Sequence, residues 1–469
     1  MGMLPAPIIL VCLFLVFAPV RSAVQLSNQY DNNRWFQLLI LVAVALFYFV
    51  DMVTRRDQPF LVTQKKPLPK FTIIILVAFS VVSAATSSYP LWAFTELSLY
   101  LLLAVLCISV YAASREQGTK VDNALIMTFV FSAFLFICKF YLDQLEAAED
   151  ANPFSWIAPF GIFGNVRFFS QYQAYTLPLM ALPLLATNWH KAWRISATVI
   201  GAIWWALQFA VATRAVWVAV LITFLLLVIF LRRESKQFLL VQATLIFGGG
   251  LLYFVFDQYI FTNMPGLGSV AGRGLDSSLR LPLWSAAIDM AVQSPLLGAG
   301  PYHFALIDRD IPAHPHNAWL QILGEYGVVA ALIVAYLVFK LIKAGIDYCK
   351  NATSLFNREM NIALLAALVM GLTASLLEGN TLMPHSQVAL MVVTGWLMGR
   401  NATEARFQVI NNAGVRNKWL LGYAVTVTFS VAIIALYTHD YFAQPQPKSG
   451  AFPTVAHPRF WINGKWPVQ

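Results

Sequence analysis

Charged residues are scarce in this chain. Of its 469 residues only 11% are Asp, Glu, Lys or Arg, whereas 59% are hydrophobic. A soluble globular protein carries about 25% charged residues, so the composition excludes that class. Apolar runs of roughly 17 to 25 residues recur along the whole length, which is typical of a protein that crosses a membrane many times.

Cysteine is rare as well, and several motifs of enzyme chemistry are missing. Of the four cysteines, Cys12, Cys107 and Cys138 lie in apolar runs and Cys349 lies in a basic loop, which argues against a disulfide framework. The sequence has no Walker loop, dinucleotide fingerprint, HExxH or CxxC motif. The net charge of +9 comes without a basic stripe interleaved with aromatic residues, so we expect no nucleic-acid partner.

The apolar windows predict an all-α polytopic membrane protein of about 12–13 transmembrane helices. Thirteen candidate spans lie near residues 4–21, 36–53, 71–87, 91–112, 123–142, 170–187, 194–211, 214–231, 238–256, 318–342, 360–377, 386–399 and 419–437. The first window, "LPAPIILVCLFLVFAPVRSA", has no Lys or Arg before its apolar core, and Arg21 occupies the would-be cleavage site. We therefore expect a retained span, with a cleaved signal peptide as the alternative.

The basic residues predict which side each loop faces. If the N-terminus is cytoplasmic, the inner loops contain most of the 31 lysines and arginines, as the positive-inside rule requires. This orientation divides the chain into N-terminal spans at 1–256, a large outer loop at 257–317, C-terminal spans at 318–437 and a short outer tail at 438–469. No soluble domain is attached.

The outer loop at 257–317 is too long to be a passive connector in a compact bundle. It opens with the Gly-rich stretch "TNMPGLGSVAGRG". Further along, Leu281, Trp284, Ile288 and Val292 fall near helical spacing, which predicts an amphipathic helix lying against the membrane surface. The loop closes with "AHPHN", immediately before the apolar window at 318–342.

Three arginines are predicted on the outer side: Arg214, Arg273 and Arg280. Arginine carries a charge that does not titrate away and a planar fork suited to phosphate oxygens. These three residues are therefore candidates for holding a phosphate-linked substrate. The alternative is that Arg214 anchors a helix at the interface and that the other two are solvated loop charges.

The two histidines of "AHPHN" are candidates for acid–base chemistry, because histidine readily takes a proton near neutral pH. His316 directly precedes the spanning helix and is the expected base, whereas His314 is expected to contact substrate. Asn317 is expected to orient His316 or to cap the helix that follows. The alternative is a pair of solvated or structural histidines, and His303 and His385 are weaker candidates.

The run "DRD" at 308–310 is similar to the metal-binding Asp-x-Asp of nucleotide-sugar transferases. It lies on the predicted outer side, where nucleotide sugars are absent. We therefore do not expect it to bind metal.

The stretch "RLPLWSAAIDMAVQSPLLGAGPYHFA…AHPHNAWLQILGEYG" resembles the signature of the O-antigen ligase and O-antigen polymerase superfamily, which includes bacterial O-oligosaccharyltransferases acting on pilins. The ligase pattern is His-Asn, nine residues, Gly, two residues, then Gly, Thr or Tyr. This chain has His316-Asn317, nine residues and Gly327, but Ala330 stands at the last position. The segment "FGNVRFFSQYQAYTLPLMALPL" also resembles the family's mid-chain span, with Arg167 and Gln171 at its outer end. The resemblance covers roughly residues 160–400.

The resemblance implies a metal-independent, inverting glycosyltransferase without a cofactor, in the inner membrane of a bacterium and with its active site facing the periplasm. The donor would be a glycan on undecaprenyl pyrophosphate, and the acceptor a hydroxyl of a pilin or of lipid A-core. His316 would be the base. Substrate contacts would come from the residues Arg214, Arg280, Arg273, His314, Asn317, Arg167 and Gln171.

Two alternatives stay open at this point. An O-antigen polymerase would share the donor and the base but use a second lipid-linked glycan as acceptor. A secondary transporter would show internal repeats and ionisable residues at mid-membrane depth, whereas here nearly every charge lies at a span end. A pure scaffold role does not account for the grouped histidines and arginines.

Overall fold

The computed structural model describes residues 4–19, 29–54, 60–63, 70–149, 158–163, 166–185, 189–256, 280–307, 313–402, 407–410, 413–443, 455–456, 460 and 465–466. The protein is an all-α multi-pass membrane protein. Among the described helices, eight are long and apolar enough to cross a bilayer, and two shorter apolar helices accompany them.

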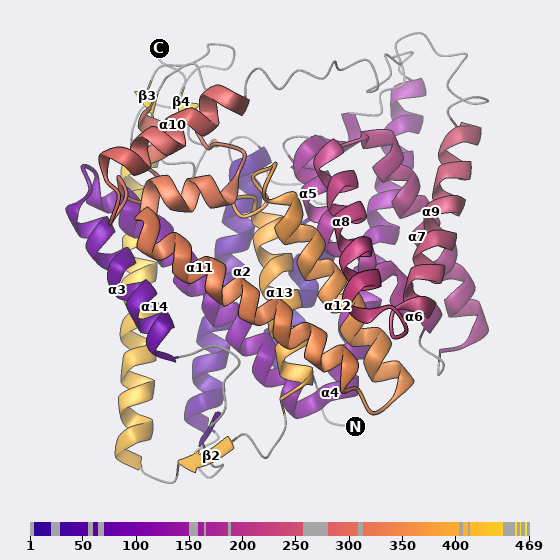
Figure 1. Ribbon diagram of the computed structural model, residues 1–469, viewed down its shortest axis with the longest axis horizontal. Helices are drawn as coiled ribbons and strands as arrows, with labels where there is room; N and C mark the ends of the chain where they lie inside the picture. The colour runs from indigo at the N-terminus through magenta and orange to yellow at the C-terminus, as the bar shows by residue number, and fades with distance from the viewer. Residues whose placement is uncertain are drawn as a thin grey trace.

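The helices follow one another closely along the chain (Figure 1). In the first part they are α1 (Ala6–Phe17), α2 (Gln29–Thr54), α3 (Lys70–Thr86), α4 (Pro90–Glu149), α5 (Val166–Thr176), α6 (Leu182–Leu185), α7 (Lys191–Val211), α8 (Arg214–Leu231) and α9 (Lys236–Val255). In the second part they are α10 (Arg280–Gln293), α11 (Ala318–Lys350), α12 (Leu355–Ala374), α13 (Pro384–Arg400) and α14 (Ala413–Ala443). Each of the thirteen predicted windows contains a helix.

Short elements complete the fold. Single turns of 3₁₀ helix are η1 (Ala158–Phe163), η2 (Pro178–Ala181) and η5 (His303–Leu306). Strand β1 (Phe60–Thr63) pairs antiparallel with β2 (Phe407–Ile410), and β3 (Val455–Ala456) pairs antiparallel with β4 (Lys465–Trp466). Neither pair was predicted, because four residues or fewer give no readable periodicity.

Helix α4 joins two predicted spans. The sequence predicts a loop at "REQGTK" between the windows at 91–112 and 123–142, and the structure has a break between two helical segments there, but as a sharp kink within α4 and not as an extended loop. The helix bends at Gly118 alone, where φ is 31° and ψ is −106°. Such a positive φ suits glycine, which has no Cβ to clash with the backbone.

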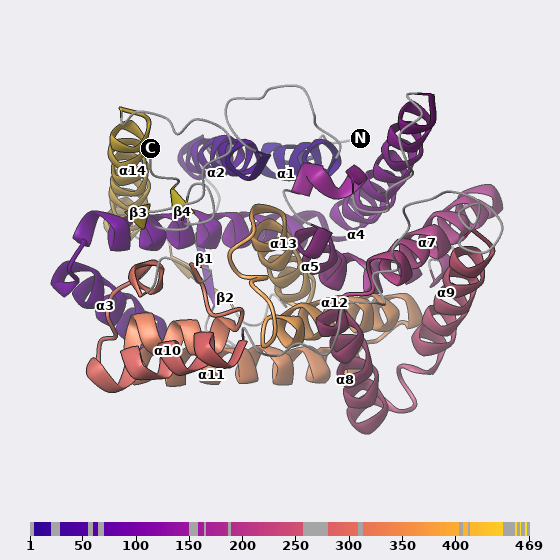
Figure 2. The ribbon, with the colours of Figure 1, turned by 90° about the horizontal axis from the view of Figure 1, so that it is seen from above.

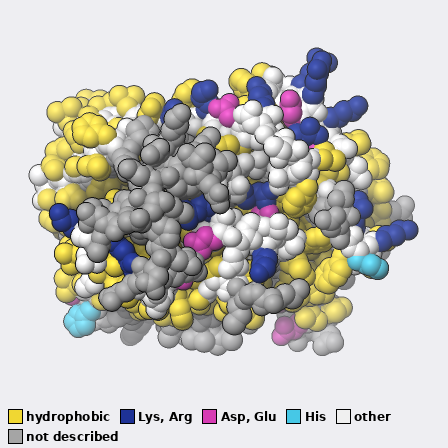
Figure 3. All heavy atoms as spheres, turned by 90° about the horizontal axis from the view of Figure 1, so that it is seen from below, with side chains coloured by type: hydrophobic (Ala, Val, Ile, Leu, Met, Phe, Trp, Pro, Cys, Tyr) yellow, Lys and Arg dark blue, Asp and Glu magenta, His cyan; other side chains and the backbone are white. Residues whose placement is uncertain are grey.

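The predicted inner and outer loops lie at opposite ends of the bundle. In Figure 1 the turns after α8 and α11 lie at the lower end, whereas α10 and the start of α5 lie at the upper end. Lys and Arg side chains are spread over the lower end (Figure 3). The sidedness, with a cytoplasmic lower end, stays a prediction from the sequence.

Helix α13 packs closely on α4 through a Gly-x-x-x-Gly pair. A Cβ atom on Gly395 would collide with the carbonyl oxygen of Cys107, and one on Gly399 with that of Tyr111. Small residues at this spacing let two membrane helices approach to backbone contact. Trp396, between the two glycines, is fully buried.

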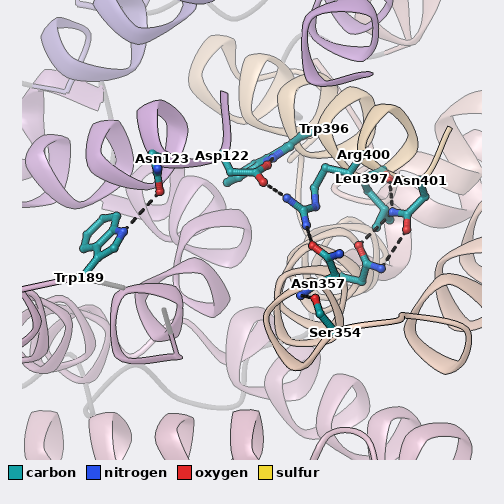
Figure 4. A network of polar contacts seen from close by, with 10 residues as sticks. Asp122, Asn123, Trp189, Ser354, Asn357, Trp396, Leu397, Arg400 and Asn401 are labelled. Atoms are coloured by element: carbon teal, nitrogen blue, oxygen red, sulfur yellow. Dashed lines mark hydrogen bonds and ion pairs between the residues drawn. The ribbon is translucent and has the colours of Figure 1, made fainter. Parts of the chain in front are cut away.

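A polar cluster fastens the lower ends of α4, α12 and α13 (Figure 4). Asp122 is buried, pairs with Arg400 and accepts a hydrogen bond of 2.7 Å from Trp396 Nε1. Arg400 also donates to Asn357 Oδ1 at 2.8 Å. Removing one partner of a buried ion pair typically costs about 3–5 kcal/mol, so this cluster holds the three helices together.

The span after α4 is broken into α5, η2 and α6 by Pro178 and Pro183. Breaking a helix inside a membrane leaves carbonyl groups that need donors. The buried amide of Gln242 supplies them, donating to Leu177 O at 3.2 Å and to Pro178 O at 2.9 Å, while Trp205 Nε1 donates to its oxygen at 3.2 Å. The short α5 is thereby held firmly, with its first residues at the upper end.

Helix α10 confirms the predicted amphipathic helix of the outer loop. Its protein-facing side packs on α11 and η5 through a small apolar cluster formed by Leu283, Ala287, Met290 and Phe304. Most of the predicted apolar face points away from the bundle: Leu281 is 61% exposed and Val292 is 73% exposed. Two apolar faces suit a helix held between protein and lipid. Seen from above, α10 lies on α11, and α5, α12 and α13 lie nearer the middle (Figure 2).

Candidate active site

Residues 313–317, which we call the histidine loop, lead directly into α11. Asn317 is the N-cap of that helix, and its Oδ1 accepts hydrogen bonds of 3.0 Å from the backbone N–H groups of Trp319 and Leu320. Of the two roles expected for Asn317, the structure shows the capping role. Contact between Asn317 and substrate stays a prediction.

His316 adopts a backbone conformation that residues with a Cβ rarely take. Its φ is 51°, in the left-handed region, where strain is of the order of 1–3 kcal/mol. Two residues further on, Ala318 donates its N–H to Ser375 O at 2.9 Å, which ties the start of α11 to the end of α12. The His316 ring is therefore held at a defined place at the upper end, with 17% of its side chain exposed.

His314 lies against His316. The ring centroids are 4.1 Å apart and the ring planes meet at 59°. His314 is 2% exposed, and a Cβ atom on Gly379 would lie 2.7 Å from its Nε2. His314 is thus closely packed, and its expected contact with substrate stays a prediction.

A buried carboxylate, Glu378, lies at the centre of the site and accepts hydrogen bonds there. The sequence did not identify this residue. It belongs to residues 375–383, which we call the acid loop, between α12 and α13. Its side chain is 2% exposed; Oε1 accepts a hydrogen bond of 3.2 Å from Arg280 Nη2, and Oε2 accepts one of 3.5 Å from Gln171 Nε2. Oε2 also lies 3.8 Å from Nδ1 of His316, which is too long for a direct hydrogen bond.

Glu378 thus connects four parts of the chain that are distant in sequence: α5, α10, the histidine loop and the acid loop. The sequence offered one weak signal. Glu378 in "LLEGN" is the one acidic residue of the short predicted outer loop between the apolar windows at 360–377 and 386–399. A single carboxylate of this kind has no spacing pattern that would single it out.

Burial and two nearby arginines shift the pKa values of His316 and Glu378. Burial, together with the positive charges of Arg167 and Arg280, lowers the pKa of His316 to about 4. The imidazole is therefore neutral at neutral pH and able to accept a proton. Burial raises the pKa of Glu378, while the charges of Arg167 and Arg280 and the hydrogen bond from Gln171 oppose that rise.

The predicted arginines are placed unevenly. Arg280 begins α10 with 34% of its side chain exposed, and Arg167 is exposed near the start of α5. Arg214 is the exposed first residue of α8, which packs against α5. The turn before it includes Ala212 in the left-handed region, with φ at 48°. Arg273 and the "DRD" run at 308–310 lie outside the described residues.

The segment after α10 explains why glycines recur in this part of the sequence. Ala299 and Gly300 donate their N–H groups to Gly324 O and Glu325 O, each at 3.0 Å. Gly298 and Gly327 both have positive φ, and a Cβ atom on either would collide with the backbone of the facing segment. The segment after α10 is thus held by backbone hydrogen bonds to α11, next to the kink of that helix at Gly327.

Two buried glutamates strengthen this attachment. Glu325 accepts a hydrogen bond of 3.0 Å from the N–H of Phe304, and Glu96 of α4 accepts one of 2.9 Å from the N–H of Tyr302. His303 Nε2 accepts from the N–H of Tyr89 at 3.0 Å, so its Nδ1 must carry the hydrogen that faces Pro301 O at 2.8 Å. His303 therefore holds the loop to the start of α4.

His385 packs among aromatic residues beside α13. Its ring centroid lies 4.5 Å from that of Phe163 and 6.0 Å from that of Tyr172. Both His303 and His385 are thus engaged in packing or loop attachment in the structure.

A protein-family model described as O-antigen ligase matches residues 186–335. Over this stretch the chain is similar to the O-antigen ligase family. The match includes Arg214, Arg280 and the histidine loop, and it ends before the acid loop. A search of curated proteins found no match. This similarity supports a glycosyltransferase activity of the O-antigen ligase or polymerase type, which favours that function over a transporter.

Proposed function

We propose that this protein transfers a glycan from undecaprenyl pyrophosphate to an acceptor hydroxyl at the periplasmic face of a bacterial inner membrane. The acceptor is a protein such as a pilin, or lipid A-core. The observation that carries the proposal is the placement of a neutral imidazole, His316, beside Glu378, Arg280 and Arg167 at the entrance to a membrane helix.

In the proposed reaction His316 is the general base. It takes the proton of the acceptor hydroxyl while the acceptor oxygen attacks the anomeric carbon of the donor sugar. The bond from that carbon to the pyrophosphate oxygen breaks on the opposite face, so the configuration inverts and polyprenyl pyrophosphate leaves. Pyrophosphate is a good leaving group, so one base, charge stabilisation and positioning are enough without a metal ion.

Glu378 supports this step electrostatically. When His316 takes the proton, its positive charge forms 3.8 Å from Glu378 Oε2. An opposite charge at this distance stabilises the imidazolium and so strengthens the base. The long spacing also leaves both groups free to move closer as charge develops.

Arg280 links donor binding to this base. Without donor it is paired with Glu378 at 3.2 Å, and its charge, with that of Arg167, disfavours protonation of His316. Pyrophosphate oxygens compete for the same guanidinium forks and neutralise their charge. Donor binding therefore removes the part of the pKa lowering of His316 that comes from the arginine charges, and it leaves Glu378 facing the histidine.

An apolar groove offers a place for the polyprenyl tail. It has a volume of about 760 Å³ and lies among α7, α8 and α9, with Phe209, Phe224, Phe247 and Phe254 in its lining. Phe209 lies five residues before Arg214, so one end of the groove adjoins the turn that carries this arginine. A lipid-open apolar groove ending at a cation suits a lipid with a phosphate headgroup.

The test uses purified full-length protein in nanodiscs and a disaccharide linked to undecaprenyl pyrophosphate. A pilin, lipid A-core and a second lipid-linked disaccharide are offered as acceptors in separate reactions. We expect transfer to one of the first two with release of undecaprenyl pyrophosphate, no loss of rate in chelator, and inversion at the anomeric carbon. Transfer only to the second disaccharide would instead identify an O-antigen polymerase, and no transfer from this donor would refute the proposal.

A further inference from the structure

The acid loop is held by buried side chains from three helices that make no contact with the reacting groups. Thr381 O accepts a hydrogen bond of 2.8 Å from Gln387 Nε2 of α13 and one of 3.3 Å from the hydroxyl of Tyr100 in α4. Leu382 O accepts one of 2.8 Å from Nη2 of Arg34 in α2. Two consecutive carbonyl groups of this loop therefore accept hydrogen bonds from side chains outside it.

Arg34 is the centre of this arrangement. Its side chain is 1% exposed, and besides Leu382 it donates to Tyr30 Oη at 2.9 Å, to Gln387 Oε1 at 2.7 Å and to Phe460 O at 3.3 Å. It also donates to Gln37 Oε1. These acceptors are all uncharged oxygens, and the rings of Tyr30 and Phe460 lie 5.6 Å and 5.3 Å from its guanidinium carbon.

The contacts form a short path from Arg34 to the reacting groups. Leu382 donates its own N–H to Gly379 O at 3.0 Å, which closes residues 379–382 into a turn. Gly379 directly follows Glu378 and lies against the ring of His314, where a Cβ atom would come within 2.7 Å of Nε2. Moving Leu382 therefore moves both the carboxylate that faces His316 and the wall behind His314.

We propose that Arg34 is a positioning residue, which sets the distance between Glu378 and His316 by holding the acid loop at Leu382. This inference rests on the proposed function of His316 and Glu378. A planar fork is required, because one guanidinium serves Leu382, Gln387 and Tyr30 at the same time and a lysine has no such fixed geometry. Nothing in the local sequence "NNRW" suggests this role, since Leu382 lies 348 residues further along the chain.

The test compares Arg34→Gln and Arg34→Lys in the full-length protein, in nanodiscs, with a disaccharide linked to undecaprenyl pyrophosphate and the acceptor that the previous experiment identifies. A misplacement of about 1 Å in an active site can lower the rate by about 10². We expect Arg34→Gln to lower kcat by about that factor with little change in the donor KM, because Arg167 and Arg280 remain. Arg34→Lys should recover part of the loss.

Arg416 of α14 provides a matched control, because it contacts the opposite end of α2 from Arg34. Its Nη2 donates to Met52 O at 3.1 Å, near the lower end of α2. Arg416→Gln removes the same kind of contact and should leave kcat unchanged. Hydrogen–deuterium exchange should become faster at residues 375–383 in Arg34→Gln but not in Arg416→Gln, and this readout does not depend on activity.

The results separate the possible outcomes. If Arg34→Gln folds, exchanges normally at the acid loop and keeps wild-type kcat, the positioning role is refuted. If Arg34→Gln does not fold, Arg34→Lys is measured in its place, because it keeps the buried charge but loses the fixed fork that reaches Leu382 O. Wild-type kcat in Arg34→Lys together with unchanged exchange at residues 375–383 would also refute the positioning role. If His316→Ala and Glu378→Gln are active too, the proposed function fails instead.

Discussion

Replacing Glu378 by glutamine tests the core of the proposed mechanism. The change keeps the size and one accepting oxygen, which can face either Arg280 or Gln171, but it removes the charge that faces His316. Two unit charges 3.8 Å apart interact by about 4 kcal/mol at an effective dielectric constant of about 20. This interaction is weakened because His316 is partly exposed and Glu378 is paired with Arg280, so we expect its loss to cost about 3 kcal/mol. That free energy corresponds to about 10² in rate.

The direction of the pH effect follows from the same charge. A neighbouring carboxylate favours protonated histidine, so removing it lowers the pKa of His316 below the value of the wild-type donor complex. Activity requires neutral His316 and is lost as the pH falls through this pKa. We therefore expect Glu378→Gln to show a lower kcat at neutral pH and an acid limb of its pH profile displaced to lower pH.

The assay is kcat for glycan transfer measured across pH under donor saturation. Glu378→Asp retains the charge one methylene further away and should fall between the wild type and Glu378→Gln. Glu359→Gln is the matched control, because Glu359 is an equally buried glutamate at the other end of α12. If Glu378→Gln had the kcat and the pH profile of the wild type, the carboxylate would have no part in catalysis.

Three further predictions concern the base, the arginine fork and the packing of α13. His316→Ala should lower transfer by about 10²–10⁴ while the protein stays folded, and His314→Ala should retain more activity. Arg280→Gln should lower kcat/KM for the donor by about 10², and Arg280→Lys should recover only part because it lacks the fork. Gly395→Leu should destabilise the protein by about 3 kcal/mol, seen as a lower thermal midpoint, whereas Gly422→Leu should not, because nothing lies within 4 Å of its Cβ position.

Each of these has an outcome that contradicts it. Wild-type turnover in His316→Ala would place the base elsewhere. Full activity in both Arg280 variants would reduce this residue to a structural partner of Glu378. Equal thermal midpoints for the two glycine variants would mean that α13 and α4 are not in backbone contact at Gly395.

The membrane architecture could be predicted from the sequence because hydrocarbon imposes a simple rule. Every backbone group must be satisfied inside the span, so apolar runs of the right length become helices wherever they occur. The amphipathic α10 and the cap at Asn317 follow from equally local patterns, namely helical spacing and the geometry of an N-cap. These features depend on residues a few positions apart, and sequence alone was enough to determine them.

The polar centre of the site could only be decided by the tertiary structure. Glu378 faces His316 across 62 positions of chain, and Arg34 reaches Leu382 across 348. A single carboxylate or guanidinium leaves no periodicity, so nothing marks it until the helices pack. The packing itself depends on backbone approach at Gly395 and on the broken span held by Gln242, which bring α5 and the acid loop to the same end of the bundle. The sequence determined which segments cross the membrane, whereas helix packing determined which charges meet there.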